Sequence, residues 1–102
     1  MDEVVRIGIA EYAVSQKPII LRTAGLGSCV GVIIYDQERG LSSMAHVMLP
    51  DSSISRNIAL EIGKFADTAV VELARRLRHS GAIRLRAKIA GGAEMFKFKY
   101  EH

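Results

Sequence analysis

"CVGVIIYDQERGLSSMAHVML", residues 29–49, holds two apolar runs separated by a short polar segment. The first run, Cys29 to Tyr35, is apolar on both faces, which is typical of a buried central strand. The polar segment 36–40, with the sequence DQERG, has the composition of a turn. The second run, Leu41 to Leu49, alternates between two kinds of side chain. This stretch therefore predicts a β-hairpin on which the rest of the fold is built.

The alternation divides the second strand of the hairpin into two faces. One face carries Leu41, Ser43, Ala45, Val47 and Leu49, and the other carries Ser42, Met44, His46 and Met48. Because successive side chains of a strand point to opposite sides of the sheet, the two sets are expected in different surroundings.

Two shorter runs before the hairpin also predict strands. Val4 to Ile9 is rich in β-forming residues, and Ile19 to Leu21 follows Pro18. A turn is expected over Ala24–Ser28, where Gly25 and Gly27 can adopt positive φ at low cost.

The period of the apolar residues becomes helical after the loop that begins at Pro50. From about Leu60 to His79 they recur at spacings of three and four, which predicts a helix with Gly81 near its C-cap. A last strand is expected over Leu85–Ala90, ended by two glycines. The order ββββαβ predicts one α+β domain over residues 1–102, layered around a mixed sheet.

Composition narrows the class of protein. The chain has 102 residues and a net charge of +3, with 49% hydrophobic and 25% charged residues, as in soluble globular proteins. Much of the positive charge lies between Arg75 and Lys88, where a solvated helix end and strand face explain it. Without tryptophan or a dense basic stripe, nucleic-acid binding is not predicted. The apolar runs are too short to cross a bilayer, and no signal peptide is apparent.

The single cysteine, Cys29, follows the glycine turn and precedes the first hairpin strand. One cysteine forms no disulfide within the chain, which agrees with a cytoplasmic location. Cys29 is also a candidate nucleophile, because an imidazole nearby can hold a thiol as thiolate. His46, on the second hairpin strand, is the candidate partner.

Strand register decides whether these two side chains meet. If Tyr35 pairs with Gly40, Cys29 lies directly opposite His46 on one face of the hairpin. If Tyr35 pairs with Leu41, the two residues fall on opposite faces unless a bulge near Gly31 restores the register.

Further residues before the strand fit a hydrolytic site. The N–H groups of the turn Gly25, Leu26, Gly27 and Ser28 can stabilise a negatively charged oxygen during attack on a carbonyl. Thr23 precedes the turn, and its oxygen can orient the imidazole of His46. Cysteine, histidine and a polar orienting group are the usual set for acyl transfer through a thioester.

Structural explanations exist for the same residues. A lone cysteine is often a small core residue, and a histidine between two methionines is often a hydrogen-bonded core residue. The glycine turn lacks the lysine and following helix of a phosphate-binding loop. The three histidines and one cysteine show no ligand spacing, so neither a metal nor another cofactor is predicted.

Four segments in a fixed order decide between these explanations. TAGLGSCVGV, MAHVMLPDS, KFADTAV and AKIAGGAEMF, between residues 23 and 96, together resemble the chemoreceptor glutamine deamidase family, CheD. The resemblance implies a cysteine hydrolase with an α/β sandwich, similar to the catalytic domains of deamidating toxins. By the same likeness Cys29 is the nucleophile, His46 the acid and base, and Thr23 the third catalytic residue.

The resemblance also implies partners and an open question. Chemoreceptors are expected as substrate, and a CheC-type phosphatase as a binding partner. Members of the family continue past the GGA-MF motif, so this chain is expected to lack the family's C-terminal part. That would leave a sheet edge exposed for self-association. The alternatives to an active deamidase are a non-catalytic adaptor that binds the phosphatase or receptors, and an inactive shortened paralogue.

Overall fold

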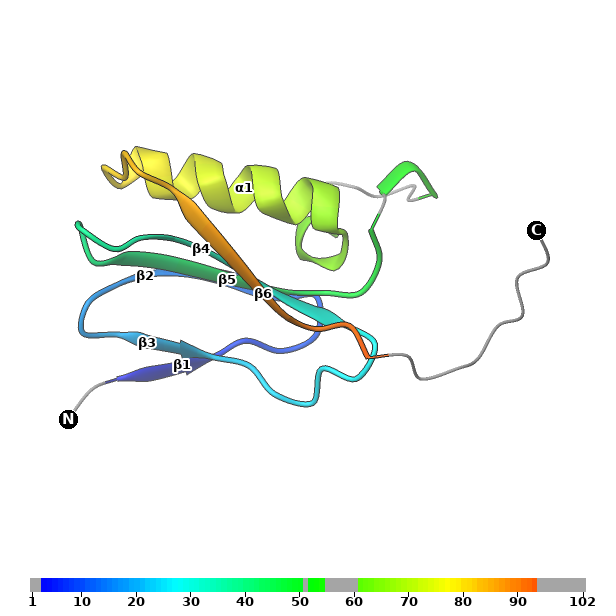
Figure 1. Ribbon diagram of the computed structural model, residues 1–102. Coiled ribbons are helices and arrows are strands. Elements are labelled where there is room, and N and C mark those ends of the chain that lie inside the picture. The colour runs from blue at the N-terminus through cyan, green and yellow to red at the C-terminus, as the bar shows by residue number, and fades with distance from the viewer. Residues whose placement is uncertain (1–2, 51, 55–60, 94–102) are drawn as a thin grey trace.

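A computed structural model of the chain describes residues 3–50, 52–54 and 61–93, which form three layers (Figure 1). The middle layer is an antiparallel sheet in the order β2-β5-β4-β6, with β2 at Tyr12–Gln16, β4 at Val30–Asp36, β5 at Leu41–Val47 and β6 at Arg86–Gly91. Helix α1, Ala66–His79, covers one face of it. A parallel pair, β1 at Val4–Arg6 and β3 at Ile20–Arg22, lies on the other side.

The predicted α+β class and the hairpin are confirmed. Parallel and antiparallel pairing both occur, but in two separate sheets. The register of the hairpin differs from both predicted alternatives, because Tyr35 pairs with Ser42 and Asp36 with Leu41. The pairing runs without a bulge from Asp36–Leu41 to Val30–Val47.

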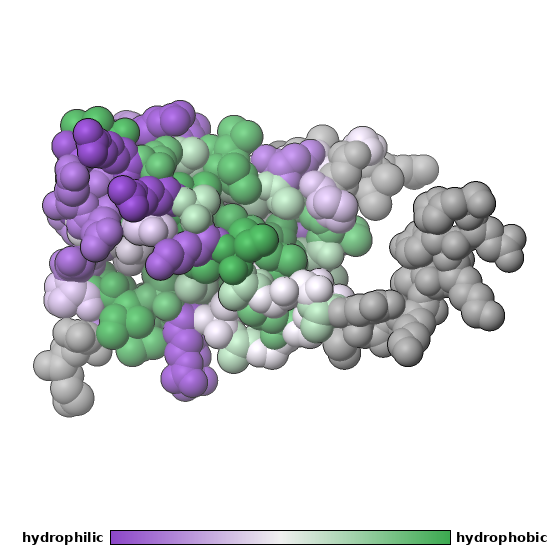
Figure 2. All heavy atoms as spheres, viewed as in Figure 1, coloured by the Kyte–Doolittle hydropathy of each residue, from purple (hydrophilic) through white to green (hydrophobic). Residues whose placement is uncertain are grey.

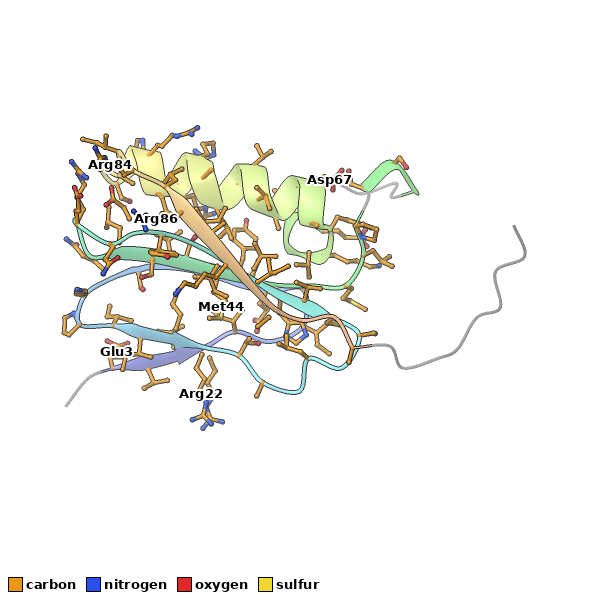
Figure 3. All side chains as sticks on the ribbon, in the orientation of Figure 1. Glu3, Arg22, Met44, Asp67, Arg84 and Arg86 are labelled. Atoms are coloured by element: carbon orange, nitrogen blue, oxygen red, sulfur yellow. The ribbon has the colours of Figure 1, made fainter. Side chains whose placement is uncertain are left out.

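The alternation in the second hairpin strand is also confirmed. Leu41, Ala45 and Val47 are buried in the core with Val32 and Ile34 of β4. From α1, the residues Ala69, Leu73 and Leu77 pack onto this cluster, and all three are fully buried. Since α1 covers this face, the other face of β5, with Met44 and His46, is directed to the β1–β3 layer, and Figure 3 shows Met44 there.

Strands β1 and β2 differ from the sequence prediction. Strand β2 was not predicted, although Tyr12 and Val14 alternate with smaller residues. β1 stops at Arg6 because the chain turns, with the Glu11 N–H donating to the Gly8 carbonyl.

The helix begins at Ala66, later than the predicted start at Leu60, a residue outside the described part of the chain. Phe65 has an extended backbone with φ −112° and ψ 139°, and it bridges to Leu49. A short 3-10 turn, Ile62–Lys64, precedes it. The bridge therefore keeps this segment out of α1. At the other end, Gly81 follows the Ser80 C-cap with φ +105°, as predicted.

Exposed charge lies where the sequence predicted it. Arg75, Arg76 and Arg78 are exposed on the last turns of α1, and Arg84, Arg86 and Lys88 are exposed on the returning strand. Figure 2 shows hydrophilic residues gathered at the end of the molecule where α1 finishes, beside a hydrophobic central region. The basic residues thus form a solvated surface.

Asp36 ties the hairpin turn to the loop after α1. Its buried carboxylate accepts hydrogen bonds from the N–H groups of Ile83 at 2.8 Å and Arg84 at 3.1 Å. It also pairs with the guanidinium of Arg39 at 3.0 Å. The N–H of Ile83 first, with Arg84 and Arg39 adding to it, lowers the pKa of Asp36 to about 2 despite the opposing effect of burial.

This pKa predicts how stability depends on pH. A carboxyl with a lowered pKa in the folded state stabilises the fold above its unfolded pKa of about 3.9, and the contribution is lost as pH falls towards 2. We therefore expect Asp36→Asn to lower the urea midpoint at pH 7, with the difference from wild type shrinking between pH 4 and pH 2.

A matched control is Glu38→Gln on the same turn. The Glu38 side chain is 65% exposed and its ion-pair distances are 3.8 and 3.9 Å, so its replacement should change the midpoint little at any pH. A difference between wild type and Asp36→Asn that stays constant from pH 7 to pH 2 would contradict the role given to Asp36.

Candidate active site

His46 lies near the end of β5, on the face directed to the β1–β3 layer, and is 1% exposed. Its main chain is held on the β2 side, where its N–H donates to Glu11 and its carbonyl accepts from the N–H of Ala10. The backbone is therefore fixed, and the orientation of the ring depends on what the two ring nitrogens contact.

Thr23 contacts one of these nitrogens. Its Oγ1 lies 3.0 Å from His46 Nδ1 and 2.7 Å from the carbonyl oxygen of Ile7. A hydroxyl has one proton, and the carbonyl can only accept, so Thr23 donates to Ile7. Thr23 Oγ1 must then accept from His46, which places the imidazole proton on Nδ1.

The other nitrogen of His46, Nε2, is buried and has no hydrogen-bond partner among the described residues. With the proton on Nδ1, Nε2 of the neutral ring carries a free lone pair. Such a nitrogen can take a proton from a thiol or a water molecule. The predicted contact of Thr23 with the imidazole is thus present, and it leaves Nε2 available as a base.

Cys29 occupies the residue just before β4 and is partly exposed. The observed register places Gly31, and not Cys29, opposite His46. Cys29 lies in the bend that ends the glycine turn, directly before the Val30–Val47 pair that closes the ladder. It is therefore two residues from Gly31, the residue opposite His46.

No hydrogen bond joins Cys29 to His46 in the described structure, since Nε2 has no partner there. Catalytic hydrogen bonds are often long or poorly aligned before substrate binds. The structure therefore places Thr23 against His46, and places Cys29 two residues from Gly31, which pairs with His46, without a direct bond between them.

The glycine turn before Cys29 has the predicted conformation. Gly25 and Gly27 have φ of +64° and +53°, and the Cys29 N–H donates to the Leu26 carbonyl at 2.8 Å. The N–H groups of Gly25, Gly27 and Ser28 donate to no acceptor within the described part of the chain. They remain available to a negatively charged oxygen.

Sequence reasoning missed two contributors to this arrangement. One is the carbonyl of Ile7, which takes the Thr23 proton; any residue type has a carbonyl, so no sequence signal exists. The other is the end of β6, where Gly92 N–H donates to the Cys29 carbonyl at 2.8 Å and Ala93 N–H to that of Gly27 at 2.9 Å. The paired glycines at the end of β6 are a sequence signal for this contact, whereas the sequence analysis predicts from them only the end of a strand.

The described residues contain no group of three or more His, Cys, Asp or Glu side chains placed to bind a metal ion. Within the same ranges, no helix combines the length and the apolar character that a membrane span requires.

Comparison with known proteins gives the class to which this fold and site belong. The family model described as CheD chemotactic sensory transduction matches residues 48–102, more than half of the chain. The chain belongs to the CheD family.

Curated members of the family are similar to this chain over nearly all of its length. The chain is 48% identical over 98 residues to the chemoreceptor glutamine deamidase CheD of Bacillus licheniformis, covering 94% of this chain and 58% of that protein. It is 48% identical over 100 residues to the protein of that name from Halalkalibacterium halodurans, and 51% over 100 residues to a probable one from Lachnoclostridium phytofermentans. Each of these two alignments covers 96% of this chain and 62% of the relative. The chain thus spans about three fifths of the length of the curated relatives it matches.

The Thr23 contact predicts the tautomer of His46. Thr23→Val removes the hydroxyl and leaves Nδ1 without its acceptor, whereas Thr23→Ser keeps an oxygen in the same place. In ¹⁵N spectra recorded with the His46 imidazole in its neutral form, we expect the ring proton on Nδ1 in wild type and Thr23→Ser. In Thr23→Val we expect a mixture of the two tautomers. A ring with its proton on Nε2 in wild type would contradict the assignment.

Proposed function

We propose that this chain hydrolyses the side-chain amide of glutamine residues in chemoreceptor proteins, giving glutamate and ammonia. The observation that carries the proposal is the buried imidazole of His46, held through Nδ1 by Thr23 with Nε2 unpaired. Leu26 of the Cys29 turn packs at Gly31, the residue that pairs with His46, which supports a site shared by the turn and the imidazole. The names of the curated relatives supply the reaction and the class of substrate.

In the first half of the reaction Cys29 is the nucleophile. His46 Nε2 takes the thiol proton, and the sulfur attacks the carboxamide carbon of the glutamine side chain. The carbonyl π electrons move to oxygen, and the N–H groups of the glycine turn stabilise the resulting negative charge. When the tetrahedral intermediate collapses, the C–N bond breaks and the imidazolium gives its proton to the leaving ammonia. The product is a thioester between Cys29 and the substrate.

In the second half a water molecule replaces ammonia. His46 Nε2 takes a proton from the water, whose oxygen attacks the thioester carbon. The C–S bond breaks, the imidazolium returns its proton to the sulfur of Cys29, and the side chain leaves as a carboxylic acid that ionises to glutamate. Thr23 accepts from Nδ1–H throughout, which stabilises the imidazolium formed in each half.

Two broader parts of the proposal follow from this chemistry. We place the protein among cysteine hydrolases with an α/β sandwich of the deamidating-toxin type, supported by the helix and sheets stacked around the site. We also propose a cytoplasmic location, since a catalytic thiol without a disulfide partner suits a reducing compartment.

The reaction is tested with a chemoreceptor of the source organism as substrate. Wild type should release ammonia and convert specific glutamines to glutamate, as followed by mass spectrometry of receptor peptides. Cys29→Ala should lower the rate by a factor on the order of 10⁴ or more, as expected for loss of a nucleophile. The exposed Val71→Ala variant on α1, with Val71 68% exposed, serves as the control and should match wild type.

A folded wild-type protein that leaves every receptor glutamine unchanged would exclude the deamidase function. If that protein also bound neither receptor nor phosphatase, the inactive shortened paralogue would be the remaining interpretation.

A second candidate function, a non-catalytic adaptor, is favoured by an apolar groove beside the site. It has a volume of about 440 Å³ and opens between α1, β4 and β6. Val70, Met48 and Ile89 line it and are 40%, 43% and 74% exposed. Ser28, in the Cys29 turn, also lines it, so a bound partner would lie next to the nucleophile.

The charge along β6 indicates which partner suits this groove. β6 is at the edge of the four-stranded sheet and all of its residues are exposed. Antiparallel pairing of two copies through β6 in the register that sets Arg86 opposite Lys88 would bring four positive charges together, and like charges in such positions are destabilising. An amphipathic segment with acidic flanks fits better than a second copy. We propose that it belongs to a CheC-type phosphatase.

The adaptor function predicts a binding defect confined to the groove. Ile89→Glu should weaken binding of the phosphatase in calorimetry. Ile83→Glu, at a residue 71% exposed but outside the groove, should leave it unchanged. Equal binding by wild type and Ile89→Glu would exclude the groove, and a dimer of wild type in sedimentation velocity that Ile89→Glu abolishes would assign it to self-association instead.

A further inference from the structure

We propose that Gly91, at the end of β6, is a positioning residue for Cys29. The inference rests on the proposed deamidase function and adds a residue to it. Gly91 lies far from Cys29 in the sequence, but it pairs with Val30, the first residue of β4, in the register of β4 with β6. The segment that follows β6 therefore runs beside the Cys29 turn.

Two main-chain hydrogen bonds join the segments. Gly92 donates to the carbonyl of Cys29 at 2.8 Å, and Ala93 donates to the carbonyl of Gly27 at 2.9 Å. The turn has its own bond from the Cys29 N–H to the Leu26 carbonyl. Together these bonds fix the backbone on both sides of the nucleophile, independently of any contact made by its sulfur.

Position 91 can be occupied only by glycine without moving this backbone. Gly91 has φ +87°, which side chains rarely adopt. A Cβ built there would lie 2.6 Å from the carbonyl oxygen of Cys29, closer than real Cβ atoms approach any atom. Because that oxygen belongs to the main chain, the clash can be relieved only by displacing Cys29 or the end of β6.

Leu26 occupies the space left open by the glycine. Its Cδ1 would be 2.9 Å from a Cβ on Gly91 and 3.7 Å from one on Gly31. Gly31 is the residue that pairs with His46 across the sheet. Leu26 thus packs between the end of β6 and the strand position opposite the imidazole, so the placement of Cys29 relative to His46 depends on Gly91.

The test compares Gly91→Ala with Gly81→Ala. Gly81 also has a strongly positive φ, +105°, but a Cβ there would meet nothing within 4 Å, and it lies in the loop after α1. Both variants therefore introduce backbone strain, and only one of them disturbs Cys29. Circular dichroism and thermal unfolding establish that each variant is folded.

We expect Gly91→Ala to lower kcat for deamidation by about 10²-fold with little change in KM, as for a misplacement of about 1 Å at a reacting group. Its rate of Cys29 alkylation by iodoacetamide, followed from pH 5.5 to 8.5, should approach that of His46→Ala. Gly81→Ala should match wild type in both assays. Should Gly91→Ala fail to fold, Leu26→Ala tests the same contact and should shift kcat and the alkylation profile in the same direction.

The two assays separate this inference from the proposed function. If Gly91→Ala, or Leu26→Ala in its place, matches Gly81→Ala in kcat and in alkylation, the positioning role is overturned. If wild type deamidates no receptor, the proposed function fails, and alkylation alone decides the positioning role: a profile changed only by the variants at the contact supports it.

Discussion

The single proton of the Thr23 hydroxyl determines how the site is arranged. The Ile7 carbonyl accepts it at 2.7 Å, so only lone pairs face the imidazole of His46, 3.0 Å away. Ile7 and Thr23 directly follow β1 and β3, whereas His46 belongs to the four-stranded sheet. The small parallel pair is therefore the layer that orients the histidine, and removing it would release the ring even if the larger sheet stayed intact.

One ring nitrogen of His46 is buried without a hydrogen-bond partner, which costs free energy of folding. Buried polar groups in the described structure are mostly paired, as when Ser43 donates to the carbonyl of Ile34 at 2.7 Å. His46 Nε2 and Ser15 Oγ are the two buried side-chain atoms that have no partner among the described residues. An unpaired buried group costs about 1–3 kcal/mol. At Nε2 this cost has a chemical use, because the free lone pair is what the proposed reaction requires.

The sequence predicted features that depend on local pattern. Alternation along Leu41–Val47 indicated which side chains enter the core, because one buried face requires apolar residues at every second position. It could not predict the register, which depends on how many residues close the turn; Asp36 pairs with Leu41, so four residues lie between the paired positions. The start of α1 at Ala66 could not be predicted from the apolar periodicity either, because it results from the bridge between Phe65 and Leu49.

The position of Cys29, the proposed nucleophile, is the feature that the sequence predicts least well. The residue type and the glycine turn make Cys29 a candidate, but its position depends on main-chain bonds from the end of β6. Those bonds require a close approach that only Gly91 permits, and they involve no side-chain chemistry that a motif search could detect. β6 is exposed along its length and contributes little to the core. Its importance is therefore better explained by the turn that it holds in place than by the apolar area that it buries.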